Sequence, residues 1–268
     1  MRNDIKLAIF DLDGTLLTKE EVLPENFYED LKYFNDLGIK IAIASARPSH
    51  DVFKLFDKGV EGLLISGEDG NAFFEGDKLI KVNHINPEAI DRVKATVKGN
   101  PYIAVMCSSL TANYLDEEDY QKFLAAGLEQ YVPYGAKPIP EDDKIVKVHV
   151  CCAGGVSQAL EVMDTLFADI KKDYEVHETG RGTIGITTKG ANKSCAVSYF
   201  AKYFNISTDN IVVFGDSETD VPMFKAAKYS FAMQNALDDV KKEATYVTKE
   251  DNGNNGAIKA LKEFLGID

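Results

Sequence analysis

Asp11 and Asp13 follow the short apolar run 6–10, separated from each other by one residue. Such a run predicts a buried parallel strand, and ligands of α/β proteins bind where these strands end. Two carboxylates there can divide phosphoryl transfer between them. One binds a cation and attacks phosphorus, while the other exchanges protons with the leaving group and water. Gly14 allows a tight turn over the site. Taken alone, an Asp-x-Asp pair is also typical of a turn or an adventitious calcium site.

Ser45 and Arg47 follow the next apolar run, residues 39–44. The Ser45 hydroxyl and neighbouring backbone N–H groups could hold phosphoryl oxygens. The segment could equally serve only to begin a helix, with Ser49 as its cap. These residues alone leave both interpretations open.

Lys193 begins a predicted helix at residues 193–204, a place where the helix dipole disfavours a cation. An anion bound nearby would explain the lysine. A solvated surface side chain is the plainer alternative, and Lys189 is a competitor for the same role.

Asp216 and Asp220 lie in a Gly-Asp-Ser-Glu-Thr-Asp segment just past the apolar run 211–214. Together with Asp11 they offer the oxygen ligands that Mg²⁺ prefers. An ordinary acidic loop, in which Asp220 caps the next helix, is the alternative.

The elements that must position these residues alternate between continuous apolar strands and amphipathic helices. This pattern predicts an α/β fold with a doubly wound, Rossmann-like parallel sheet covered on both faces. The predicted strands are 6–10, 39–44, 62–65, 211–214 and 229–232, with 246–247 as a candidate edge strand, and the helices are 24–38, 48–56, 193–204, 221–227, 236–243 and 257–265.

The alternation of apolar strands and amphipathic helices stops after about residue 82, where a different pattern of elements begins. The predicted elements there are helices at 87–97, 117–127 and 157–170, strands at 102–107 and 144–151, and a hairpin of 174–177 with 183–187. Alternation in 144–151 predicts an antiparallel strand with one packed face. We therefore expect a core domain of residues 1–82 and 187–268 and an inserted α+β domain of residues 83–186.

The composition argues against several classes of partner. The chain has 268 residues and a formal net charge of −13, which repels nucleic acid and anionic lipid headgroups. No apolar run reaches the roughly 18 residues of a membrane span, and no secretory signal begins the chain. We expect a cytoplasmic protein, a monomer by default with a dimer as the alternative. The four cysteines lack zinc-site spacing, and buried reduced thiols are the expected interpretation.

The four segments around Asp11, Ser45, Lys193 and Asp216, in this order along the chain, resemble the signature motifs of the haloacid dehalogenase superfamily. Within that superfamily the chain is most similar to the Cof-like branch. Segments 66–72 (Ser-Gly-Glu-Asp-Gly-Asn-Ala) and 232–236 (Ala-Met-Gln-Asn-Ala) are similar to further segments of that branch. The resemblance covers nearly the whole chain. It implies that the insertion is the branch's large α/β cap and that Mg²⁺ is the cofactor.

The same resemblance implies a role for each site residue. Asp11 is the nucleophile and a metal ligand, and Asp13 is the general acid/base, with its backbone carbonyl on the metal. Lys193 neutralises the nucleophile and the phosphoryl group. The phosphate contacts are Ser45 and Arg47, and the further metal carboxylates are Asp216 and, in support, Asp220.

Two positions depart from the branch's pattern. The usual Thr-Gly-Arg is Ser-Ala-Arg here, which keeps the hydroxyl donor but adds the methyl group of Ala46. Thr219 replaces the usual asparagine before the last aspartate, and so loses an amide that could contact phosphate.

We therefore predict a magnesium-dependent phosphatase of small phosphorylated metabolites, sugar phosphates above all, acting through an aspartyl-phosphate. Polar residues in 111–114 and 178–183, with Arg181 as the charged contact, are the candidates for recognising the leaving group. The alternatives are a phosphomutase of the same superfamily and a non-catalytic phosphometabolite sensor.

Overall fold

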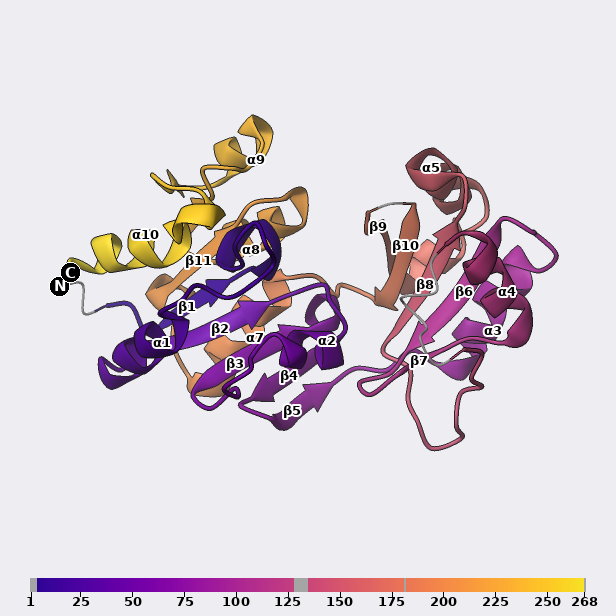
Figure 1. Cartoon of the computed structure of the whole chain (residues 1–268), viewed down its shortest axis with the longest axis horizontal. Coiled ribbons are helices and arrows are strands. Elements are labelled where there is room, and N and C mark those ends of the chain that lie inside the picture. Colours follow the sequence, from indigo (N-terminus) through magenta and orange to yellow (C-terminus); the bar gives the residue numbers. More distant parts are fainter. Residues whose placement is uncertain (1–3, 128–134, 181, 268) are drawn as a thin grey trace. The chain divides into compact units, whose positions relative to one another are not determined.

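The computed structural model describes residues 4–127, 135–180 and 182–267. The chain forms two compact units (Figure 1). The first comprises Met1–Arg47, Asp51–Lys81 and Asn192–Asp268, and the second comprises Pro48–His50 and Val82–Ala191. The first unit carries all seven predicted catalytic, phosphate-binding and metal-binding residues.

An eight-stranded sheet forms the centre of the first unit. Its order is β13-β12-β11-β1-β2-β3-β4-β5, and the strands from β13 to β3 are parallel. The strands are β1 (Leu7–Phe10), β2 (Lys40–Ala44), β3 (Leu63–Gly67), β4 (Ala72–Glu75), β5 (Lys78–Val82), β11 (Ile211–Gly215), β12 (Tyr229–Ala232) and β13 (Tyr246–Val247). Because β1 lies between β2 and β11, the connections leave it in opposite directions. This is the place where α/β sheets bind ligands.

Strands β4 and β5 were not predicted from the sequence. Strand β4 pairs with β3 in antiparallel fashion, and β5 forms the sheet edge, with mostly exposed or half-buried residues. Gly76, at φ 60°, lies in the turn between them. The Gly-Asp pair between two short apolar runs was the available hairpin signal. The sheet is therefore parallel in its centre and antiparallel at one edge.

Helices cover this sheet. They are α1 (Phe27–Asp36), α2 (Ser49–Lys54), α7 (Ser194–Phe204), α8 (Val221–Ala226), α9 (Asp238–Glu243) and α10 (Gly256–Leu265). Ala196, Val197 and Phe200 of α7 are fully buried in one cluster with Leu7 and Val213. This packing fixes the start of α7 against the strands whose ends carry the acidic residues.

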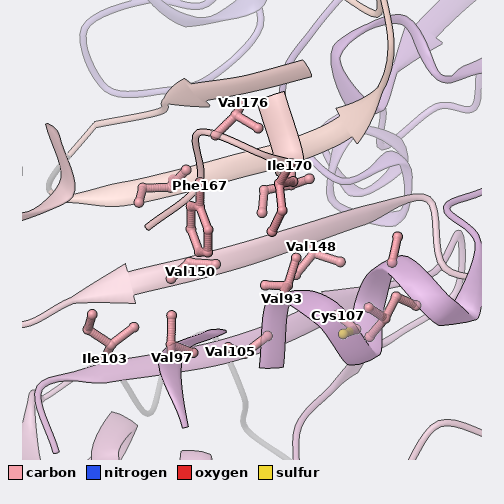
Figure 2. Packing of buried hydrophobic residues seen from close by; sticks show 14 of the residues in the cluster. Val93, Val97, Ile103, Val105, Cys107, Val148, Val150, Phe167, Ile170 and Val176 are labelled. Carbon is pink, nitrogen blue, oxygen red and sulfur yellow. The ribbon is translucent and has the colours of Figure 1, made fainter. Parts of the chain in front are cut away.

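The second unit contains a five-stranded antiparallel sheet of order β7-β6-β8-β10-β9. Its strands are β6 (Ile103–Ser108), β7 (Asn113–Tyr114), β8 (Lys147–Cys152), β9 (Tyr174–Glu178) and β10 (Thr183–Thr188), and its helices are α3 (Pro87–Val97), α4 (Glu117–Ala125), α5 (Gly155–Thr165) and α6 (Ile170–Asp173). Figure 2 shows its core, where Val93 of α3, Val105 of β6, Val148 and Val150 of β8, and Phe167 gather.

The prediction of a single packed face for β8 was wrong. Lys147 is only 2% exposed and His149 only 9% exposed, although both alternate with the apolar residues of the strand. Strand β8 is central, between β6 and β10. Helix α4 packs through Phe123 against Ala104 and Met106, which alternate with the residues that face the core in Figure 2. The second face of the sheet is therefore covered as well.

The fold class predicted from the sequence, an α/β protein with a parallel sheet at its centre, is confirmed. All four cysteines are free thiols. Among the described residues no helix has the length and apolar character needed to cross a membrane.

Candidate active site

Asp11 lies directly after β1, and its backbone N–H donates to the Phe214 carbonyl at 2.9 Å, which fixes it beside the end of β11. Lys193 precedes the first residue of α7. Its Nζ lies 2.6 Å from Asp11 Oδ1 and 2.7 Å from Asp220 Oδ1. All three side chains are at most 5% exposed. Residues 182 positions apart in the chain thus form a buried ion pair.

The lysine is the only described ammonium paired with this acidic cluster, and it stays charged. Burial lowers the pKa of Lys193, but the carboxylates of Asp11 and Asp220 outweigh that effect and raise it. Burial raises the pKa of Asp11 well above its usual range, opposed by Lys193 and reinforced by Asp220 and Asp216. Burial and the Asp220 charge raise the pKa of Asp216 to about 6. Burial and the neighbouring carboxylates thus make negative charge at Asp11 and Asp216 unfavourable, and the single Lys193 ammonium does not offset this effect.

Three carboxylates meet here: Asp11, Asp216 and Asp220 each offer one oxygen, and these oxygens lie within 4.8 Å of one another. The Thr15 hydroxyl donates to Asp216 Oδ1 at 3.2 Å. Gly14, at φ 76°, lies so close that a Cβ atom there would be 2.3 Å from Asp216 Oδ2. The turn after Asp11 thus requires glycine both for its backbone conformation and for the space beside Asp216.

Asp220 binds Lys193 with one carboxylate oxygen and holds its own loop with the other. Its Oδ2 accepts the backbone N–H groups of Asp216 and Ser217, each at 2.9 Å, and forms a capping box with Ser217. Its other oxygen accepts Lys193. The capping box belongs to the short 3₁₀ segment Glu218–Asp220, and the Asp220 side chain makes no capping bond to α8, the helix that the sequence interpretation had it cap.

Asp13 and Arg47 form a pair at the rim. The Arg47 guanidinium donates from both Nε and a terminal nitrogen to the two carboxylate oxygens of Asp13, with Nε–Oδ2 at 2.8 Å, and reaches Glu21 at 3.3 Å. The Asp13 side chain is 49% exposed, unlike the buried cluster. Ser45 is buried, and its Oγ accepts the Arg47 backbone N–H at 3.1 Å. In this arrangement the serine hydroxyl also stabilises the local loop.

The comparison with known proteins decides the family. Residues 8–261 match the family described as haloacid dehalogenase-like hydrolase. The chain belongs to this family. It is 25% identical to the Bacillus subtilis 5-amino-6-(5-phospho-D-ribitylamino)uracil phosphatase YwtE, over 97% of this chain and 98% of that protein. A shorter stretch, 31% of this chain and 35% of the relative, is 43% identical to the phosphoglycolate phosphatase of Nitrosopumilus maritimus.

Solved structures of other proteins share the fold. SMU.1108c from Streptococcus mutans superposes with a TM-score of 0.84 at 24% identity, covering 98% of this chain and 99% of that one. The sugar phosphatase BT4131 has a TM-score of 0.75 at 22% identity, with 97% and 98% covered. The predicted family is confirmed, and the named phosphatases among the relatives support the predicted enzyme class.

Sequence reasoning missed three contributors to the site of this haloacid dehalogenase-like protein. Thr15 donates to Asp216, Glu21 accepts from Arg47, and the Asn235 amide donates to the Gly14 carbonyl at 2.8 Å. Asn235 lies in the segment 232–236 that the resemblance had already singled out, and Thr15 directly follows Gly14. No local pattern marks Glu21, because its partner is distant in the sequence.

The structure describes Thr219 and most of the residues that were predicted to recognise the leaving group. Thr219 bonds to the Ser217 hydroxyl at 2.9 Å. Thr111 and Tyr114 both donate to Asp143 in the second unit. Arg181 lies outside the described residues. These bonds hold local loops and do not by themselves identify a ligand.

The carboxylate cluster fits a magnesium ion. Three carboxylates with one ammonium give a formal charge of −2, which one divalent cation neutralises. All the donors are hard oxygens, the ligand type that Mg²⁺ prefers over nitrogen or sulfur.

Proposed function

We propose that this haloacid dehalogenase-like protein is a magnesium-dependent phosphatase of small phosphorylated metabolites, with Asp11 as the nucleophile. One observation carries the proposal: the buried Lys193 ammonium pairs with Asp11 inside a three-carboxylate cluster at the end of the central strands. Phosphoryl transfer depends mainly on positioning and on charge that matches the transferring oxygens. A lysine between two buried carboxylates supplies part of that match.

The residues proposed to hold Mg²⁺ are Asp11, Asp216 and the backbone carbonyl of Asp13, with Asp220 in support. When bound, the ion supplies positive charge to the nonbridging phosphoryl oxygens. Thr15 donates to the Asp216 carboxylate, and Asp220 accepts the backbone N–H of Asp216, so both the side chain and the backbone of this residue are held. Such support of metal ligands by surrounding hydrogen bonds is the usual arrangement.

The proposed reaction has two displacements. An Asp11 carboxylate oxygen forms a bond to phosphorus, the bond from phosphorus to the leaving oxygen breaks, and Asp13 gives that oxygen a proton. In the second step a water oxygen attacks phosphorus, its proton passes to Asp13, and the Asp11 carboxylate is released with inorganic phosphate. The rim position of Asp13 suits this shuttle, because its carboxylate is half exposed while that of Asp11 is buried.

Ser45 and Arg47 are proposed to contact the phosphoryl oxygens. Arg47 is held by Asp13 and Glu21 in this structure, so binding of phosphate would exchange one anionic partner for another. A guanidinium suits this exchange because it binds carboxylate and phosphate with the same paired donors.

Sugar and sugar-alcohol phosphates are the proposed substrates. The support is the name of the relative that acts on a phosphoribityl compound and the name of the structural neighbour called a sugar phosphatase. Residues 83–186 are proposed as the family's cap domain, which selects the leaving group. We propose that the enzyme acts in the cytoplasm as a monomer.

A phosphate-release screen tests the proposal. The parent protein is assayed over a panel of sugar, sugar-alcohol, nucleotide and flavin phosphates, with and without Mg²⁺ and without any bisphosphate. Release that requires Mg²⁺ and disappears in Asp11→Asn is the expected result. Turnover that appears only with a bisphosphate activator would indicate a mutase, and tight binding without turnover would indicate a sensor.

A further inference from the structure

A strained turn lies next to the phosphate-motif residues. Glu68 and Asp69, directly after β3, have φ values of 54° and 56°, and they are 0% and 3% exposed. Left-handed backbone is unfavourable for residues with a side chain, and two in succession persist only where the surrounding structure enforces them. With Gly70 they form the short 3₁₀ segment Glu68–Gly70, called here the 68–70 turn.

One side of the 68–70 turn holds the loop that carries Ser45 and Arg47. The backbone N–H of Glu68 donates to the Arg47 carbonyl, and that of Asp69 donates to the Ser45 carbonyl, each at 3.2 Å. The Ser45 N–H in turn donates to the Ser66 carbonyl at 2.9 Å. Three backbone bonds therefore fix this loop against residues 66–69, and the left-handed conformation directs two successive N–H groups toward it.

The other side of the 68–70 turn touches the start of α7. A Cβ atom on Gly70 would lie 2.5 Å from the Asn192 carbonyl oxygen and 2.8 Å from Cys195 Cβ. That same oxygen accepts the Cys195 N–H at 2.9 Å, in the first turn of the segment that carries Lys193. Gly70 itself has a φ of 86°. The backbones of the turn and of the Lys193 segment are thus in direct contact.

We propose that the 68–70 turn is a positioning element that sets Ser45 and Arg47 on one side, and Lys193 on the other, at the separation that a phosphoryl group requires. The turn acts through its backbone and does not touch the substrate. This inference rests on the proposed function for its meaning in catalysis, but its structural content is independent of that function. A shift of a catalytic group by about 1 Å can cost about 10²-fold in rate.

Two glycine substitutions form a matched test. Gly70→Ala strains a left-handed backbone and places a methyl group against the Asn192 oxygen. Gly76→Ala strains a left-handed backbone of the same sheet, but the nearest atom, the Val60 carbonyl oxygen, is 3.7 Å away. We expect Gly70→Ala to lower kcat by about 10²-fold and Gly76→Ala to leave kcat within about twofold. Equal kcat values for the two variants would overturn the proposal.

A pair of substitutions at Asp69 distinguishes the contribution of the backbone conformation from that of the side-chain carboxylate. Asparagine tolerates the left-handed conformation as aspartate does, whereas valine does not. Asp69→Val is expected to raise KM by at least about tenfold through the Ser45 loop, while Asp69→Asn keeps KM and kcat near the parent values. A loss in Asp69→Asn as large as that in Asp69→Val would show that the carboxylate, and not the backbone, carries the role. This pair also decides the matter if Gly70→Ala does not fold.

Amide hydrogen exchange gives a readout that needs no substrate. Peptides covering residues 45–47 and 192–195 are compared among the parent and the four variants. In Gly70→Ala the exchange of the 192–195 amides should rise by at least about tenfold, with no such rise in Gly76→Ala. If the parent releases phosphate from no ester but this difference appears, the proposed function fails and the positioning role stands. Unchanged exchange in an active enzyme refutes the positioning role alone.

Discussion

Replacing Lys193 with methionine removes the ammonium that the buried cluster depends on while keeping an unbranched side chain of comparable length. Lys193 Nζ lies 2.6 Å from Asp11 and 2.7 Å from Asp220, and the three side chains are 5%, 5% and 0% exposed. The variant therefore leaves two buried carboxylates and the half-buried carboxylate of Asp216 with no described cation among them. Removing one partner of a buried pair costs about 3–5 kcal/mol.

Catalysis should fall together with stability. The ammonium lies where the nucleophile and the phosphoryl charge must be balanced, and loss of one such group costs about 10²–10³ in kcat. Mg²⁺ should offset part of the stability loss, because it meets three carboxylates without an ammonium to repel it. We expect the rise in Tm on adding Mg²⁺ to be larger in Lys193→Met than in the parent.

The assay is phosphate release under saturating substrate, with thermal unfolding at several Mg²⁺ concentrations. Lys189→Met is the matched control, because Lys189 is exposed and its Nζ donates to the Lys171 carbonyl, within the second unit, at 2.8 Å. The control should keep kcat within about twofold. A kcat for Lys193→Met within tenfold of the parent value, or an equal Mg²⁺ effect on Tm in both proteins, would refute the reasoning.

Three further predictions follow from the same site. Thr15→Val removes the hydroxyl donor to Asp216 and should weaken Mg²⁺ activation by about tenfold, measured as the Mg²⁺ concentration for half-maximal rate. Gly14→Ala should abolish activity in a folded protein, since its Cβ would lie 2.3 Å from Asp216. The pKa of Asp216 is raised to about 6 from 3.8. Without metal, the folded protein therefore binds more protons than the unfolded protein between these pH values. The free energy of unfolding should fall as pH rises from about 4 to about 6, by at most about 3 kcal/mol. Urea unfolding in EDTA should show this fall in the parent and a smaller one in Asp216→Asn.

The sequence predicted most of the central fold because its signals are local. Apolar runs such as Leu7–Phe10 and Ile211–Gly215 become buried strands, and α3 begins at Pro87, where Asn86 caps it, and ends at Val97 as predicted. The acidic residues at these strand ends could be expected to meet, since parallel strands end at the same edge of a sheet.

What the sequence did not show depends on distant contacts. Strand β5 is exposed and short, so burial leaves no pattern on it. Lys147 is polar by type and alternates with valines, yet α4 covers its face of the sheet. The Arg47–Asp13 pair joins side chains that are 34 positions apart in the chain. The 68–70 turn is held by residues 45–47 and 192–195, which are also distant in the sequence. No spacing rule encodes either contact.

The central claim is that Asp11 takes up the phosphoryl group, and trapping the intermediate tests it most directly. The parent is mixed with an active substrate and Mg²⁺, quenched in acid, reduced with borohydride to convert an acyl phosphate to an alcohol, and digested for mass spectrometry. We predict the reduced residue at position 11, dependent on Mg²⁺ and on substrate. Substrate turnover with no modification at Asp11, or with the modification on another carboxylate, would contradict the account.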